Sequence, residues 1–177
     1  MPASSPRLWD LDFQPLVVDG TIAPHLRGKI GLYAIFDAVQ ALQLVAYSRD
    51  VALSVAQHLV RQPQACHWLK VHCLERPSRS VLEQLQADWL AESGGLPPGH
   101  GAQAAAWRDP IDVKPAMTAA EQARYAASDD LERGKLLKAI ARRVEAERVQ
   151  ALRSRGVTME LRFNPKLKEQ GLLDLKL

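Results

Sequence analysis

The sequence predicts an α+β fold in which three strands alternate with two helices, followed by a helical extension. Two apolar, β-prone runs at residues 30–36 and 42–47 flank a short turn and predict a hairpin. A helical pattern from residue 51 to near Pro63 and an alternating pattern at 67–74 follow. A second helical pattern at residues 81–90 comes next.

Each of the two helices begins at a residue whose side chain can cap it. Ser48 and Asp50 are candidates for the N-cap of the first helix, and Ser78 and Ser80 for that of the second. The glycine pair at 94–95 favours a stop at the end of the second helix.

Composition along the chain suggests four parts. Residues 1–27 mix Pro, Asp and scattered apolar residues and predict an arm that packs on the domain. The compact domain follows at 28–100. A Gly-, Pro- and Ala-rich linker at 101–117 then leads to a basic helical extension with a tail at 118–177.

The C-terminal part begins with a capping box formed by Thr118 and Glu121. We expect a helical stretch from there to about Arg155, with a break near Gly134. Alternation at residues 157–163 predicts a strand, and the apolar tail at 172–177 is expected to dock on another surface.

Composition indicates a globular protein, since 47% of the 177 residues are hydrophobic. No run of eighteen apolar residues is present and the N-terminus lacks the pattern of a signal peptide, which predicts a cytoplasmic protein with no membrane span. The spacing of Cys66 and Cys73 fits neither a zinc knuckle nor a disulfide framework. The sequence gives no indication of the oligomeric state.

The order of the elements, with Gly31-Leu32-Tyr33 in the first strand, resembles the GIY-YIG nuclease superfamily and its three-stranded antiparallel sheet flanked by helices. The resemblance is strongest to the form of this domain fused to a chloroplast glutaredoxin in plants and to stand-alone cyanobacterial proteins. It covers about seventy residues and is carried by Gly31–Asp37, Leu42-Gln43, Ser48–Val51, His58-Leu59, Leu69–Val71, Trp89 and Leu96–Gly99.

This resemblance implies roles for particular residues. In active members a magnesium ion on a glutamate stabilises the leaving oxygen, tyrosines position the attacking water and an arginine neutralises the phosphate. Tyr33 and His58 match the first-motif tyrosine and the helix histidine. Glu92 is the candidate ligand for magnesium or manganese, with Glu83 as the alternative.

The sequence also departs from the family at residues that the chemistry needs. The second motif reads Leu44-Val45-Ala46, without its tyrosine, and strand alternation turns Tyr47 toward the opposite face. Ser54 stands in the position of the essential arginine, so that Arg49 or Arg61 would have to replace it.

These departures favour a GIY-YIG nuclease-like protein with a degenerate active site, which binds nucleic acid and has weak or no metal-dependent endonuclease activity. One alternative is a protein-interaction adaptor that uses the C-terminal tail. A second is an active endonuclease that uses Arg49 or Arg61 with magnesium or manganese.

Charge adds a second candidate surface for DNA or RNA. Residues 118–177 hold 13 Lys and Arg against 9 Asp and Glu, whereas residues 1–117 hold 10 against 11. Basic side chains along the predicted helix can contact phosphates, or they can be a solvated face paired with neighbouring glutamates. The candidates are Lys135, Lys138, Arg142, Arg148, Arg153 and Arg155.

Overall fold

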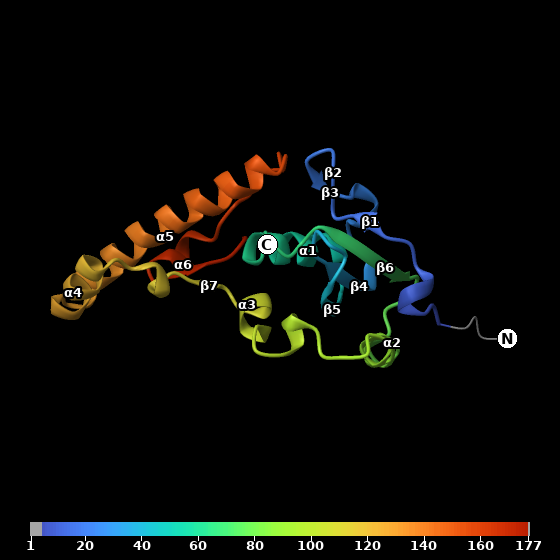
Figure 1. Cartoon of the computed structure of the whole chain (residues 1–177). Coiled ribbons are helices and arrows are strands. Elements are labelled where there is room, and N and C mark those ends of the chain that lie inside the picture. The colour runs from blue at the N-terminus through green and yellow to red at the C-terminus, as the bar shows by residue number, and fades with distance from the viewer. Residues whose placement is uncertain (1–4, 177) are drawn as a thin grey trace. The chain divides into compact units, whose positions relative to one another are not determined.

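The computed structural model describes residues 5–176, which group into two compact units that meet in the chain between Arg108 and Asp109 (Figure 1). In the first unit the elements are η1 (Leu8–Asp10), β1 (Gln14–Pro15), β2 (Val17–Val18), β3 (Thr21–Ile22), η2 (Pro24–Leu26), β4 (Ile30–Phe36), β5 (Leu42–Ser48), α1 (Val51–Arg61), β6 (Trp68–Leu74), α2 (Arg79–Glu92), η3 (Pro98–His100) and α3 (Ala104–Arg108), where η marks a 3-10 helix. In the second unit they are β7 (Ile111–Asp112), η4 (Lys114–Ala116), α4 (Ala119–Ala127), α5 (Asp130–Ser154), α6 (Pro165–Lys168) and β8 (Leu172–Leu173).

The class is α+β, as predicted, but the main sheet has four strands instead of three. Its order is β1-β6-β4-β5, with every neighbouring pair antiparallel. The fourth strand is β1, in which Gln14 and Pro15 pair with Leu69 and Trp68. Two residues of a proline-containing segment carry no alternation that a sequence pattern can reveal, and so this strand was missed.

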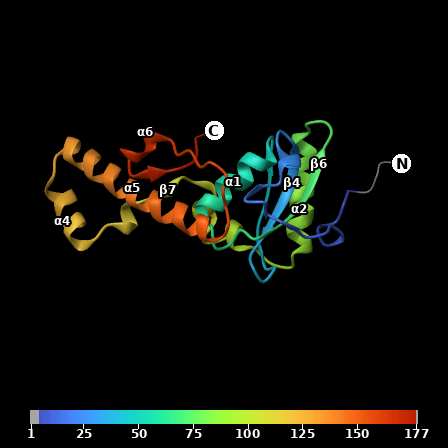
Figure 2. The same cartoon turned by 90° about the horizontal axis from the view of Figure 1, so that it is seen from above.

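The two faces of the sheet are covered by different helices. Leu32, Ala34 and Phe36 on β4 share a buried cluster with Leu82 and Trp89 of α2. Side chains alternate along a strand, so Tyr33 and Ile35 point to the other face, where α1 packs. The view in Figure 2 shows β4 between α1 and α2.

A glycine is required at the start of β4 because the neighbouring strand lies too close for a side chain. A Cβ atom on Gly31 would lie 2.6 Å from the backbone oxygen of His72. The glycine of the first motif therefore allows β4 and β6 to pair closely beside Tyr33.

Capping side chains begin both helices where the sequence predicts them. Asp50 accepts the backbone N–H of Leu53 at the start of α1, and Ser78 accepts that of Val81 at the start of α2. Gly94 adopts a positive φ of 73° just after α2 ends, as expected for a helix stop.

The second unit confirms the predicted capping box and corrects two other predictions. Thr118 and Glu121 form both hydrogen bonds of the box at the start of α4. The helical stretch breaks before Asp129, whose side chain caps α5, and Gly134 lies inside α5. A capping carboxylate at a new helix start outweighs the modest cost of one glycine within a helix.

The predicted strand at residues 157–163 was also wrong. Only Phe163 pairs there, through an isolated bridge to Leu175, and the strand of this region is β8, which pairs with β7. The apolar tail supplies β8, which is the partner of β7, and Leu175, which is the partner of Phe163. Leu173 of the tail is fully buried. The tail therefore packs within its own unit.

Within residues 5–176, none of the helices combines the length and the apolar character needed to span a membrane.

Candidate functional site

The site predicted from the first motif is held together by a hydrogen bond between Tyr33 and His58. The hydroxyl of Tyr33 lies 2.9 Å from Nε2 of His58. Both side chains are almost fully buried, with exposed fractions of 2% and 7%. The prediction that Tyr33 faces His58 is confirmed, because strand parity turns Tyr33 toward α1.

A backbone carbonyl fixes the protonation of this pair. Nδ1 of His58 lies 3.0 Å from the carbonyl oxygen of Trp107, which can only accept a hydrogen bond. His58 therefore carries its proton on Nδ1, and Nε2 accepts the hydroxyl proton of Tyr33. Arg61 donates to the same Trp107 oxygen at 3.0 Å.

Burial keeps both members of the pair neutral. It raises the pKa of Tyr33 far above its usual value, while the Ser54 hydroxyl and the Arg61 guanidinium act in the opposite direction. Burial, followed by the charge of Arg61, lowers the pKa of His58 to about 4. At neutral pH the two residues therefore form a neutral donor and acceptor instead of an ion pair.

A cavity of about 270 Å³ opens beside His58 at the edge strand β5. Its lining residues are Leu44, Val45, Ala46, Tyr47, His58, Gln86, His100 and Arg108. The lining brings together two imidazoles, an amide and a guanidinium, which are groups that favour an anion over a cation.

Two side chains take the place of a neighbouring strand at this edge. Val45 donates its backbone N–H to Nε2 of His100 at 3.1 Å and accepts from Nε2 of Gln86 at 2.9 Å. A Cβ atom on Gly99 would lie 2.8 Å from the oxygen of Gln43. The absence of a side chain at Gly99 therefore lets η3 approach the edge and deliver His100 to it.

Leu44 and Ser54, the two positions at which the resemblance implies a tyrosine and an arginine, lie close to this site. Leu44 pairs with Ile35 on the Tyr33 face and lines the cavity. Ser54 donates to the hydroxyl of Ser48 at 2.6 Å and interacts with Tyr33. Tyr47 lies on the opposite face, as predicted, and donates to Glu83 at 3.3 Å.

Neither predicted arginine lines the cavity. Arg49 is exposed just before α1 begins, whereas Arg61 is buried and donates to the carbonyl of Trp107. The cation that lines the cavity is Arg108, at the end of α3. Arg108 forms no ion pair with any residue in the part of the chain that the structure describes.

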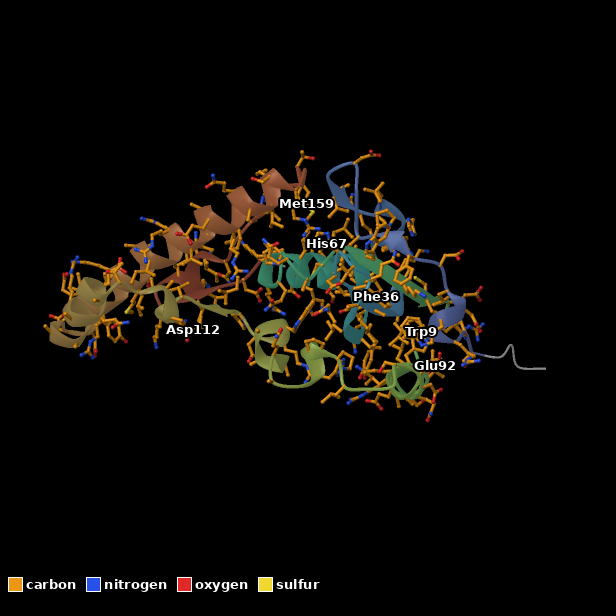
Figure 3. The ribbon with its side chains drawn as sticks, viewed as in Figure 1. Trp9, Phe36, His67, Glu92, Asp112 and Met159 are labelled. Carbon is orange, nitrogen blue, oxygen red and sulfur yellow. The ribbon has the colours of Figure 1, made fainter. Side chains whose placement is uncertain are left out.

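Glu92 is not brought together with Tyr33 and His58. It ends α2, on the opposite face of the sheet, where its carboxylate accepts the backbone N–H of Leu8 at 3.0 Å and lies 3.8 Å from Arg7. Trp9 donates to its backbone oxygen, and Figure 3 shows both residues where η1 meets α2. The expectation that Glu92 and Tyr33 share one site is corrected: Glu92 anchors the N-terminal segment.

The cavity residues do not fit magnesium or manganese. Both ions prefer oxygen ligands, usually carboxylates, and the lining contains no Asp or Glu. Over residues 5–176 no three His, Cys, Asp or Glu side chains are grouped so as to hold a metal ion. Glu83 also lies away from His58, beside Arg79 and Tyr47.

Three of the six basic side chains predicted to contact nucleic acid are engaged within the chain. Lys135 pairs with Glu132 and Lys138 with Glu169. Arg153 donates to the backbone oxygens of residues 157 and 159. The others are the exposed Arg142 and the half-buried Arg148 and Arg155, which both interact with other groups. A nucleic-acid role for this helix stays a prediction.

Four residues of the site were not predicted as functional. Trp107 acts through its backbone oxygen, for which a side-chain pattern gives no signal. Gln86 and Arg108 lie on elements that the sequence treats as a plain helix and a linker. His100 directly follows the Leu96–Gly99 segment of the resemblance, and its contact with Val45 leaves no signal in the sequence.

No protein-family model matches the chain. A search of known proteins finds the chloroplastic bifunctional monothiol glutaredoxin-S16 of Arabidopsis thaliana, with 37% identity over 84 residues. The matched region is 45% of this chain and 29% of the plant protein. The chain is a partial homologue of that protein. It thus spans less than a third of its relative, whose name places that protein in the chloroplast. The cytoplasmic location stays a prediction.

The role of Glu92 leads to a stability prediction. Glu92→Gln replaces a carboxylate that accepts the Leu8 N–H by a weaker neutral acceptor, and we expect it to lower the free energy of unfolding by about 1–2 kcal/mol. The matched control Glu83→Gln changes an exposed helix carboxylate and is expected to lower the free energy of unfolding by less than Glu92→Gln does. Urea unfolding of both variants measures the difference; equal effects would refute the anchoring role.

The pKa of His58 leads to a pH prediction. Because the folded pKa of about 4 lies below the ordinary 6.5, the unfolded chain binds the proton more tightly. The contribution of His58 to stability is complete above pH 6.5 and is lost as pH falls toward 4, by at most about 3 kcal/mol. His58→Gln should therefore lose less stability than wild type between pH 7 and 4.5. Parallel losses of melting temperature would contradict the assignment.

Proposed function

We propose that the first unit is a GIY-YIG nuclease-like module whose cavity binds a phosphodiester group of a nucleic acid and cleaves it weakly or not at all. The observation that carries the proposal is the composition of the cavity. Its lining includes Arg108 and His58, which is the member of the buried Tyr33–His58 pair that reaches the cavity. The lining contains no carboxylate.

Binding is supported by the charge and position of Arg108. The guanidinium of Arg108 lines the cavity and forms no ion pair among the described residues. It can therefore bind a phosphate through two parallel hydrogen bonds. The floor of the cavity is the edge of β5, and its walls come from α1, α2, η3 and α3. A phosphate next to Arg108 would therefore also lie close to the imidazole of His100.

Weak or absent cleavage is supported by what occupies the catalytic positions. Leu44 replaces one tyrosine, and Ser54 stands in the position of the arginine. Each lost group is expected to remove on the order of 3 kcal/mol of transition-state stabilisation, by analogy with oxyanion donors. The two carboxylate candidates bind other groups: Glu92 accepts the backbone N–H of Leu8, and Glu83 pairs with Arg79.

The adaptor alternative has less support, since the apolar tail packs within the second unit. The active-nuclease alternative needs Arg49 or Arg61 at the phosphate. Arg61 is held by the Trp107 carbonyl, and Arg49 would have to reach the cavity from an exposed position outside its lining.

Removing one phosphate contact should weaken binding without changing the fold. We expect Arg108→Gln to reduce the affinity for a short fluorescent DNA duplex by about three- to tenfold at 50 mM salt, and to flatten the salt dependence by about one counterion. The matched control is Arg49→Gln, which removes an equal charge outside the cavity. Fluorescence anisotropy measures both. Equal losses in the two variants would assign binding to net charge alone.

Plasmid nicking distinguishes binding from catalysis. With magnesium or manganese present, we expect wild type to nick supercoiled plasmid no faster than His58→Gln, because the cavity lacks ligands for either ion. Efficient nicking by wild type that His58→Gln abolishes would establish the active-nuclease alternative instead.

A further inference from the structure

The hydrogen bond between Val45 and His100 joins two groups that both face the cavity. Val45 lies on the outer edge of the sheet, so its N–H points away from β4. Nε2 of His100 accepts this N–H and so carries no proton itself. In the unliganded state the Val45 N–H and the lone pair of Nε2 satisfy each other, so neither group offers a donor to an anion.

The other titratable groups around His100 show which of them can respond to pH. Arg108, on α3, brings the guanidinium of the lining. His58, on α1, uses both ring nitrogens, toward Tyr33 and Trp107, and its pKa of about 4 keeps it neutral above pH 5.

The remaining titratable group in the lining is Tyr47 of β5, which is bonded to Glu83 on the far face. The α2 residue in the lining, Gln86, does not titrate. His100 is therefore the group whose charge can change near neutral pH.

We propose that the cavity binds a tetrahedral oxyanion of the phosphate class together with one proton, which His100 takes up from solvent. This inference rests on the proposed function and specifies how its site recognises the ligand. On binding, the bond from Val45 N–H to Nε2 breaks, a proton adds to Nε2, and the new Nε2–H donates to the anion. The freed N–H of Val45 turns from an internal donor into a second donor to the same anion.

Arg108, the imidazolium of His100 and the N–H of Val45 then converge on one ligand. Without the added proton, the lone pair of Nε2 keeps the Val45 N–H engaged, and neither group can donate to the anion. The arrangement thus links affinity to pH: burial and the charge of Arg108 lower the pKa of His100 in the free cavity, and a bound anion raises it.

Sulfate is a suitable probe because its own charge stays constant between pH 5.5 and 8.5. Isothermal titration calorimetry of the full chain in two buffers with different ionisation enthalpies counts the protons taken up. We expect up to one proton per sulfate, and an affinity that falls by at most about tenfold per pH unit as pH rises.

The variant His100→Gln separates charge from hydrogen bonding. A glutamine keeps an acceptor for Val45 and a donor for the anion but does not titrate. Its sulfate affinity should change by less than about twofold over the same pH range. A variant with the pH dependence of wild type would overturn the proposal, since another group would be taking up the proton.

Two further results overturn the inference and identify what has failed. Proton-coupled binding is refuted if sulfate binds without proton uptake, or if wild type does not bind sulfate at pH 5.5. In either case the proposed function still stands if Arg108→Gln weakens DNA binding more than Arg49→Gln does. If Arg108→Gln weakens DNA binding no more than Arg49→Gln does, the proposed function itself fails.

Discussion

The hydrogen bond from Tyr33 to His58 and onward to the Trp107 carbonyl is the interaction on which the site depends. It connects Tyr33 of β4 to His58 of α1, 25 residues further along the chain, and His58 to Trp107 of α3, another 49 residues further on. Because the Trp107 oxygen can only accept, it determines the tautomer of His58 and therefore the direction of both bonds. Burial keeps the pair neutral. His58 thus gives the cavity an uncharged wall on one side.

That wall shapes the electrostatics of the edge strand. With His58 neutral and Arg61 bonded to the same carbonyl, the positive charge that lines the cavity comes from Arg108. His100 and Gln86 satisfy the backbone of Val45 as a neighbouring strand would, which protects an edge that otherwise invites pairing with another chain. The side chains that protect the sheet edge therefore also line the proposed anion site.

The sequence predicted the parts of the fold that rest on local patterns. Alternation and motif order predicted the pairing of β4 with β5 and the contact of Tyr33 with His58, and capping residues predicted the starts of α1, α2 and α4. It missed β1, because two residues carry no period. It misplaced Glu92, because helical spacing does not reveal which face of a sheet a helix covers. The roles of Trp107 and Arg108 depend on a tertiary contact of a segment that reads as a linker.

The proposed function requires the β5-edge cavity of the first unit to bind phosphate groups of a nucleic acid without a metal ion. Amide NMR spectra recorded during titration with a short DNA duplex, in the presence of a metal chelator, test this requirement. The largest shifts are expected at Val45, Tyr47, His100 and Arg108. Shifts confined to α5, or shifts that appear only after magnesium is restored, would contradict it.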